Sequence, residues 1–545
     1  MFPRYSTADD EDPARRRSLS CFWWFLFPML VTAALEAPGL EMGTTQVVPA
    51  ALRQMKAAMG GAQWDVIAVI SAEGEKTSFG LTGKFHLVED LRSGAFEASC
   101  DYGIFPNAEG MDRLGRWRQD NSGQVHPLDS REAQEVAVTE SYLARHGFFF
   151  PERSPATFRR LDPVLEDSRG FDRIVVTPED GRAVALWIDR STHVLDRAVL
   201  ELSLGTKIIH YGNYRVVGTI RLPFKVIVEH RDENETGIAR IRSYQISKTP
   251  LEHELTRPAV LSDTAMVGEA SATITRGYVD RDTGFFIVPA RINGKGPFPF
   301  ILDTGGHDIL TPGAVRELGL PAMGKGFSQG AGAGSTPTEF TKVDRLDIGA
   351  ATVSRQPFTI LHIDLGRTKD GNAPSAPVAG ILGLEVFERF AITIDYKNEA
   401  VTWQPILGSL YQGAGQGVPI RFTSDMPVVA AALDNHSGWF DLDTGNNVDL
   451  IVFRNWKLSS GLATGHEKGT GIDGNGAGGA VAMRVAGTGS LRIANKTLDN
   501  LRILIPSAQA GSLSARWEAG NFGNSVLSHF KVTFNYRSEL VYLEP

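Results

Sequence analysis

The C-terminal half of this 545-residue chain contains the same unit twice. Residues 380–405 and 520–545 align without a gap at a shift of 140, and nine of the 26 positions are identical. The identical pairs are Gly380/Gly520, Gly383/Gly523, Val386/Val526, Phe390/Phe530, Thr393/Thr533, Tyr396/Tyr536, Glu399/Glu539, Val401/Val541 and Pro405/Pro545. The same shift places residues 300–305 on residues 440–445. The pattern indicates a tandem duplication over 270–405 and 415–545. It does not indicate a solenoid, because solenoid repeats are only about 20–50 residues long.

Each copy carries Asp-Thr-Gly directly after an apolar run, at residues 303–305 and 443–445. A single carboxylate with an ordinary pKa of about 4 is a poor catalyst of amide hydrolysis, whereas two carboxyl groups about 3 Å apart share one proton. One group can then act as a base on a water molecule while the other donates a proton to a carbonyl oxygen. We therefore predict that Asp303 and Asp443 form a catalytic pair. Glycine allows the two loops to approach closely and threonine hydroxyls can tie them together, so the predicted supporting residues are Thr304, Gly305, Thr444 and Gly445.

A third Asp-Thr-Gly occurs at residues 282–284. It follows Val279-Asp280-Arg281 rather than an apolar strand end, and it has no counterpart at the shift of 140. We interpret it as a turn. The two matched copies are more specific, although a duplicated β-domain with Asp-Thr-Gly turns and no chemistry is the alternative interpretation.

Residues 270–545 resemble the pepsin/retropepsin-like aspartic proteases, and specifically the exported bacterial aspartyl proteases with two retropepsin-like units. The resemblance rests on the two strand–Asp-Thr-Gly segments and on Ile381-Leu382-Gly383, which precedes an apolar closing strand. It implies a mainly β, bilobal double-ψ β-barrel with one lobe at 270–405 and the other at 415–545. It also implies that Asp303 and Asp443 are the catalytic aspartates of an aspartic endopeptidase, a hydrolase acting on polypeptides.

Both copies depart from the family pattern at some positions. Asn521 replaces the first apolar residue of the triplet, and the residues after the two motifs are Gly306 and Asn446. Asp441 is an unexpected charge on a strand, and an outward-facing side chain is its simplest interpretation. His307, beside the first motif, is interpreted as an exposed loop residue rather than a member of the site. The first copy has no tyrosine between Tyr278 and Tyr396, so a pepsin-type flap tyrosine is absent there.

Glycine-rich segments fall at similar places in the two copies, at 324–334 and 469–479. The family closes hairpin flaps over its substrate, and mobile loops need a permissive backbone. The candidate flap residues are Gly330, Gly332, Gly334, Gly474, Gly476 and Gly478.

Residues 46–258 show many short runs of alternating polarity with turn signals between them, which predicts an antiparallel β-sheet domain. A helix is expected near 48–59, and strands are expected at 64–70 and 183–189, among others. The segment loosely resembles LolA-like lipoprotein-carrier domains. No catalytic constellation is recognised in it, so it is predicted to be an accessory domain.

The first residues predict export. Three arginines at 15–17 precede an apolar run at 19–35 and then small residues, the pattern of a signal peptide. Over residues 1–37 we therefore expect a signal peptide or, if it is not cleaved, a membrane anchor. The expected location is the periplasm or the extracellular space.

Composition excludes several other classes of function. A net charge of −8 and a pI near 5.9 argue against nucleic-acid binding. Two cysteines cannot build a four-cysteine zinc site, and no His-Glu-x-x-His pattern is present, so neither a metal nor a cofactor is expected. Because duplication supplies both aspartates in one chain, a monomer is expected. The alternative from another class is a non-catalytic envelope protein that binds peptides or lipoproteins and retains a vestigial pair of aspartates.

Overall fold

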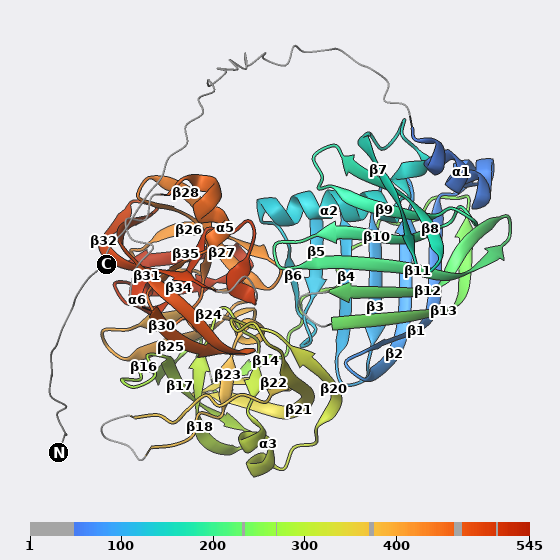
Figure 1. Ribbon diagram of the computed structural model, residues 1–545. Helices are drawn as coiled ribbons and strands as arrows, with labels where there is room; N and C mark the ends of the chain where they lie inside the picture. Colours follow the sequence, from blue (N-terminus) through green and yellow to red (C-terminus); the bar gives the residue numbers. More distant parts are fainter. Residues whose placement is uncertain (1–47, 231–234, 269, 370–374, 463–470, 508–510) are drawn as a thin grey trace, which may run out of the picture. The chain divides into compact units, whose positions relative to one another are not determined.

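The computed structural model describes residues 48–230, 235–268, 270–369, 375–462, 471–507 and 511–545 (Figure 1). The predicted signal peptide or anchor at 1–37 lies outside these residues. Residues 47–545 form one compact unit. Among the described helices, none combines the length and the hydropathy that crossing a bilayer requires. The fold is mainly β with large antiparallel sheets, as expected, whereas the double-ψ β-barrel stays a prediction.

The first sheet is built entirely from residues 69–247 and contains 13 strands in the order β6-β5-β4-β3-β2-β1-β13-β12-β11-β10-β9-β8-β7. Its neighbouring strands are antiparallel and consecutive in the chain, apart from β1 and β13, which pair although they are far apart in sequence. Its strands are β1 Val69–Ser78, β2 Leu81–Asp90, β3 Phe96–Asp101, β4 Pro106–Asp112, β5 Gly115–Gln119, β6 Val125–Pro127, β7 Ala156–Glu166, β8 Arg169–Pro178, β9 Val184–Asp189, β10 Leu195–Glu201, β11 Thr206–Val217, β12 Ile220–His230 and β13 Glu235–Ser247.

Helices cover part of this sheet. They are α1 Ala50–Ala58, η1 Gly61–Val66, α2 Arg131–Ala144 and η2 Gly147–Phe149. Helix α2 begins where the Ser130 hydroxyl accepts a hydrogen bond from the Ala133 N–H, a usual N-cap arrangement. Trp64, Tyr142 and Leu186 share one buried apolar cluster, which joins the helices to the sheet. The helix predicted near 48–59 and the strand predicted at 183–189 are confirmed. The strand predicted at 64–70 is wrong over most of its length, because Gly61–Val66 form a 3-10 helix and β1 begins only at Val69.

The second sheet is built from the first repeat and from β14, which precedes this repeat in the chain. Its order is β14-β22-β19-β23-β18-β17-β21-β20, with β16 paired to β17. Its strands are β14 Thr264–Met266, β16 Tyr278–Val279, β17 Phe286–Ile292, β18 Lys295–Leu302, β19 Ile309–Leu310, β20 Met323–Ser328, β21 Thr336–Ile348, β22 Ala351–Leu361 and β23 Gly380–Leu382. Helices α3 Pro312–Leu318 and α4 Leu384–Phe387 accompany them.

The third sheet combines strands of both repeats, in the order β15-β25-β24-β34-β35-β26-β27-β28-β33-β29-β32-β31-β30. Its strands are β15 Thr273–Arg276, β24 Phe390–Asp395, β25 Ala400–Pro405, β26 Gln416–Thr423, β27 Met426–Leu433, β28 His436–Leu442, β29 Leu450–Val452, β30 Gly471–Gly476, β31 Gly479–Ile493, β32 Lys496–Pro506, β33 Gly520–Phe522, β34 Lys531–Asn535 and β35 Leu540–Glu544. The remaining helices are α5 Arg454–Ser460, η3 Ser512–Ser514, α6 Asn524–Leu527 and η4 Tyr536–Ser538.

The duplicated residues occupy equivalent places in the two repeats. Strand β18 pairs in parallel with β23, and β28 pairs in parallel with β33, in registers that differ by 140 residues. The repeats meet at the antiparallel pair β24–β34, where Thr393 lies opposite Thr533 and their hydroxyls are 2.8 Å apart. One apolar core runs through both repeats, so neither half has to bury its apolar surface alone.

Candidate active site

The two Asp-Thr-Gly loops begin where two buried strands end. The Asp303 N–H donates to the Leu382 carbonyl over 3.0 Å, and the Asp443 N–H donates to the Phe522 carbonyl over 3.1 Å. Each aspartate is therefore held by the strand that pairs in parallel with its own. The Gly305 N–H donates to Asp303 Oδ1 over 2.8 Å and orients this carboxyl group.

The structure brings Asp303 and Asp443 together, and their carboxyl groups are hydrogen-bonded to each other. A Cβ atom added to Gly305 would lie 2.7 Å from Asp443 Oδ1, and one added to Gly445 would lie 2.4 Å from the Asp303 carboxyl group. Neither contact is sterically possible, so each glycine makes room for the aspartate of the other repeat. This is the close approach for which the sequence predicts glycine.

Burial and the neighbouring charge change the acidity of both groups. Burial, followed by the charge of Asp443, raises the pKa of Asp303 well above its usual value. Burial also raises the pKa of Asp443, although the hydrogen bond from Asn521 opposes this shift. Two carboxyl groups in contact cannot both ionise easily, so the pair holds one proton over a wide range of pH.

This shared proton predicts how stability depends on pH. A pKa that is higher in the folded than in the unfolded protein gives stability that is complete below the unfolded value of about 4 and decreases as pH rises through the folded value. Asp303→Asn removes one ionisable group, so we expect it to stabilise the protein near pH 7 by about 1 kcal/mol or a few degrees in Tm. The gain should disappear near pH 4. Thermal unfolding across this range measures it, with Asp282→Asn at the exposed third motif as the control, and a gain that grows toward acid pH would contradict the shared proton.

The threonines of the two motifs tie the repeats together through hydrogen bonds. The Thr304 hydroxyl donates to the Leu442 carbonyl over 2.7 Å, and the Thr444 hydroxyl donates to the Leu302 carbonyl over 2.8 Å. Each hydroxyl also accepts a hydrogen bond of 2.9 Å from the backbone N–H of the other threonine. Both side chains are fully buried.

Thr304→Val keeps the size of the side chain but leaves a buried carbonyl and a buried N–H without partners. We expect it to lower the free energy of unfolding by about 2–4 kcal/mol, because each unpaired buried group costs about 1–3 kcal/mol. Thr304→Ser keeps the hydroxyl and should cost about 1 kcal/mol, the value of a lost methyl group. Denaturant unfolding measures both variants. Equal losses for Val and Ser would mean that the hydroxyl contacts are not what stabilises the loops.

The departures from the family pattern have structural reasons. A Cβ atom on Gly306 would lie 2.8 Å from Asp303 Oδ2, so a side chain there would press on the carboxyl group. In the second repeat the Asn446 amide donates to Asn521 Oδ1 over 2.8 Å, and the Asn521 amide donates to Asp443 Oδ2 over 2.7 Å. Asn521, which the sequence flagged only as a departure, is thus a direct partner of Asp443.

Asp441 does not face outward, so the simplest interpretation of its sequence position is wrong. Its side chain is 6% exposed, and Phe440 and Leu442 on either side lie in the apolar core. Strand alternation therefore turns Asp441 to the same side as Asp443. Burial, followed by the charges of Glu518 and Asp443, raises the pKa of Asp441 well above its usual value.

His307 belongs to a polar bridge rather than to a free loop. Its Nδ1 lies 2.9 Å from Glu385 Oε1, and its Nε2 lies 3.3 Å from Asp425 in the turn between β26 and β27. Asp425 also lies 3.1 Å from His126 of strand β6 in the first sheet. Burial opposes a charge on His126, but Asp425 and Glu388 outweigh it and raise its pKa to about 10. A charged His–Asp–His bridge thus joins the first sheet and both repeats next to the Asp303 loop.

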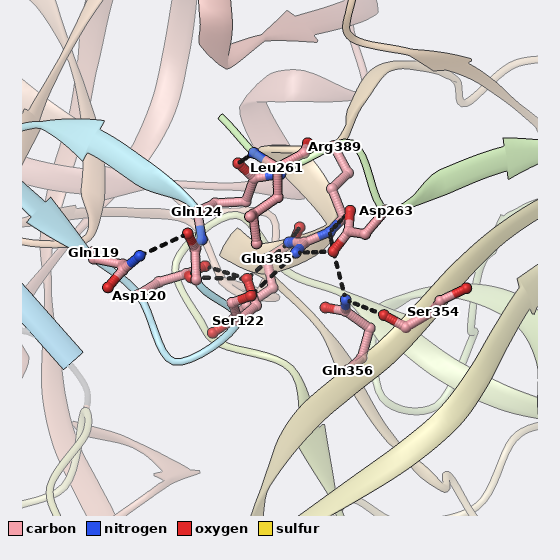
Figure 2. A network of polar contacts seen from close by, with 11 residues as sticks. Gln119, Asp120, Ser122, Gln124, Leu261, Asp263, Ser354, Gln356, Glu385 and Arg389 are labelled. Atoms are coloured by element: carbon pink, nitrogen blue, oxygen red, sulfur yellow. Dashed lines mark hydrogen bonds and ion pairs between the residues drawn. The ribbon is translucent and has the colours of Figure 1, made fainter. Parts of the chain in front are cut away.

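Arg389 anchors a second network behind the same loop, shown in Figure 2. Its side chain is 1% exposed, and its Nη2 donates to Asp263 Oδ2 over 2.6 Å. Its Nη1 donates to the Ser122 hydroxyl and to the Glu385 carbonyl, both over 2.8 Å. Asp263 lies in the linker between the first sheet and the first repeat, and Ser122 lies in the turn between β5 and β6. The network connects three separate stretches of chain.

The two glycine-rich segments form hairpin tips that contact each other. The Gly332 N–H donates to the Ala477 carbonyl and the Gly334 N–H donates to the Gly478 carbonyl, both over 2.8 Å. A Cβ atom on Gly332 would lie 2.3 Å from the Gly478 carbonyl carbon, so a side chain cannot be accommodated there. The contact is reciprocal, because Ala331 packs against an apolar cluster of the second repeat and Ala477 packs against one of the first. Gly330 lies against Ala477 and Gly476 against Ala331, whereas Gly474 has no comparably close neighbour across the contact.

Comparison with known proteins bears on this site. Residues 288–386 match the aspartyl protease family. The matched stretch runs from β17 through the first Asp-Thr-Gly loop to α4, and it supports an aspartyl protease domain in this part of the chain. A comparison with curated proteins found no match.

Three solved structures show some similarity to this chain. A domain from Vibrio parahaemolyticus assigned to outer membrane lipoprotein sorting is 12% identical, with 37% of this chain and 93% of that chain covered and a TM-score of 0.27. A LolA superfamily protein from Nitrosomonas europaea is 12% identical, with 37% and 94% covered and a TM-score of 0.28. The MucA/MucB complex of Pseudomonas aeruginosa gives 12% identity, 61% and 100% coverage and a TM-score of 0.16. These low scores assign neither a fold nor a function to the chain.

Proposed function

We propose that this protein is an aspartic endopeptidase whose two catalytic aspartates, Asp303 and Asp443, come from the two repeats of one chain. The observation that carries the proposal is the contact between their carboxyl groups, each of which has a raised pKa. The family match over residues 288–386 supports it. A pair that shares one proton contains a base and an acid at the same time, which is what hydrolysis of an amide requires.

The hydrogen bonds around the pair favour one assignment of roles. The Asn521 amide donates to Asp443 and so favours a negative charge there, while the pKa of Asp303 is raised further. Asp443 is then the base that takes a proton from a bound water, and the water oxygen attacks the scissile carbonyl carbon. Asp303 donates its proton to the carbonyl oxygen. In the second step Asp443 passes the proton from the water to the amide nitrogen, Asp303 takes a proton back from a hydroxyl of the resulting diol, and the C–N bond breaks to release the amine and the acid.

The duplicated architecture allows a monomer to complete this site. Retropepsin-like sites built from two identical chains obtain the same symmetry by association, whereas here the pairing of β24 with β34 and the threonine contacts join the halves within one chain. The interlocked tips at Gly332 and Gly478 would act as flaps over a bound polypeptide. They must separate for a substrate to enter, which fits lid opening as a step of the cycle.

The first sheet is proposed to be an accessory domain. In this role it supports the site and also binds any ligand of its own. His126 and Ser122 reach the neighbourhood of the Asp303 loop through Asp425 and Arg389. Export to the periplasm or beyond is proposed from the N-terminal sequence alone.

The test is cleavage of unfolded polypeptides by the purified protein between about pH 3.5 and 7.5. We expect a bell-shaped profile, since activity needs one protonated and one ionised carboxyl group. Binding of peptides without cleavage at any pH would favour the alternative of a non-catalytic binding protein.

A further inference from the structure

The walls beside the two aspartates have opposite chemistry in the two repeats. In the first repeat Ile301 lies opposite Ile381, and both belong with Val378 to an apolar cluster. The shift of 140 residues carries these three positions to Asp441, Asn521 and Glu518. The register is the same, because Asp441 lies opposite Asn521.

The acidic wall is buried and incompletely satisfied. Asp441 is 6% exposed and Glu518 is 4% exposed. The Ser203 hydroxyl donates to Glu518 Oε2, but Glu518 Oε1 has no hydrogen-bond partner among the described residues. An unpaired buried carboxylate oxygen is costly, so its retention points to a donor that the protein itself does not supply.

Asp441 and Glu518 line a cavity of about 250 Å³. Met426 also lines it, and a Cβ atom on Gly305 would lie 3.1 Å from the Met426 methyl group, so one side chain of the cavity wall contacts the first Asp-Thr-Gly loop. Its volume approaches the lower end of the range for ligand pockets, about 300 Å³. It is large enough for one long side chain.

Three cations that line the cavity, Arg116, Arg118 and Lys207, pair with other acids. Arg116 pairs with Glu109 and Glu140, and Lys207 pairs with Glu140. Arg118 lies 3.3 Å from Asp425. Among the described residues, no ion pair joins a cation to Asp441 or Glu518. The nearby helix α2 adds another acid, Glu132.

We propose that the second repeat binds a basic side chain, Lys or Arg, on one side of the scissile bond, while the apolar wall of the first repeat binds an apolar side chain on the other. The inference rests on the proposed endopeptidase function and names its substrate class. An ammonium or guanidinium group would donate to Glu518 Oε1 and Asp441 and would offset their buried charge. Ile301 and Ile381 offer no such acceptor, so the preference is one-sided.

The experiment uses the purified full chain and a proteome-derived peptide library, with cleavage sites read by mass spectrometry. We expect Lys and Arg at one position flanking the cleaved bond and apolar residues at the other. For a matched pair of peptides with Lys or norleucine at that position, the ratio of kcat/KM should favour Lys by about 10- to 100-fold, the range of a charged hydrogen bond.

The double variant Asp441→Ile/Glu518→Val gives the second repeat the residues of the first, and it should lose or reverse this ratio. Because buried changes can impair folding, Asp441→Asn/Glu518→Gln serves as a second variant of nearly the same shape, and it should lower the ratio by about 10-fold or more. Glu317→Gln, on the exposed face of helix α3, removes a charge away from the cavity and is the matched control.

The outcomes separate two failures. A wild-type protein that cleaves peptides without a basic preference would overturn this inference and leave the endopeptidase proposal intact, as would an unchanged ratio in the Asn/Gln variant. A wild-type protein that cleaves nothing would overturn the endopeptidase proposal itself.

Discussion

Asp303→Asn is expected to lower kcat/KM for peptide cleavage by at least about 10³-fold, and Asp443→Asn is expected to do the same. In the proposed mechanism either change removes a proton donor or acceptor from a step in which both carboxyl groups take part, and general acid–base catalysis contributes about 10²–10⁴-fold for one group. The two losses should not add in the double variant, because the pair acts as a unit. Initial rates with a fluorogenic peptide at the optimum pH measure all three variants.

The chain contains its own control for this experiment. Asp282 occupies the same Asp-Thr-Gly sequence, but its side chain is exposed and pairs with Lys369. The Asp280 carboxylate accepts hydrogen bonds from the N–H groups of Asp282 and Thr283, so this copy forms the turn that the sequence predicts. Asp282→Asn should keep wild-type activity. Full activity in Asp303→Asn or Asp443→Asn, with a folded protein, would remove these residues from the catalytic site.

Arg389→Met is expected to lower the free energy of unfolding by about 3–5 kcal/mol. The change keeps much of the side-chain volume but leaves Asp263 without its main partner in a buried site, and breaking one side of a buried ion pair has costs of this size. The nearby acids Asp120 and Glu388 then lose a compensating charge as well. Urea unfolding followed by tryptophan fluorescence measures the loss.

Two further variants define the cause of this loss. Arg421→Gln removes the same charge at a partly exposed pair with Glu539, and it should cost only about 0–1 kcal/mol. Asp263→Leu combined with Arg389→Met removes both charges of the pair and should recover part of the stability, since Asp263 no longer remains as an unpaired ion. If Arg389→Met unfolds like Arg421→Gln, the buried network does not hold the linker to the first repeat.

Local sequence patterns are enough to predict the members of the candidate site that occur in both repeats, namely the two Asp-Thr-Gly motifs. Asp-Thr-Gly after an apolar strand needs only alternation and a glycine where another loop approaches, and both are local properties. The contact of Gly305 with Asp443, and of Gly445 with Asp303, follows from that pattern once the two copies are paired. The glycine-rich segments are also recognisable in the sequence, whereas the contact between the two hairpin tips cannot be predicted from it.

Other members of the site carry no local signal. His126 and Ser122 lie in a sheet with no recognised motif, and they approach the Asp303 loop only because Asp425 and Arg389 meet them across the fold. In the sequence, Asn521 only replaces an apolar residue of a hydrophobic triplet. In the structure, its amide donates a hydrogen bond to Asp443. A comparison of the two copies position by position is the one signal that could have identified it.

The order of residues is sufficient to predict that the chain contains one unit twice and that each copy ends a strand with an aspartate, since repeats and strand alternation are local properties of a sequence. Which side chains face those aspartates depends on how the chain folds. Asp441 shows the reason: alternation assigns it a face, but whether that face meets water or a buried cavity depends on Glu518, Met426 and a distant sheet that packs against it. Burial and the pKa of a carboxyl group are set by neighbours far away in the chain, and these neighbours exist only in the folded protein.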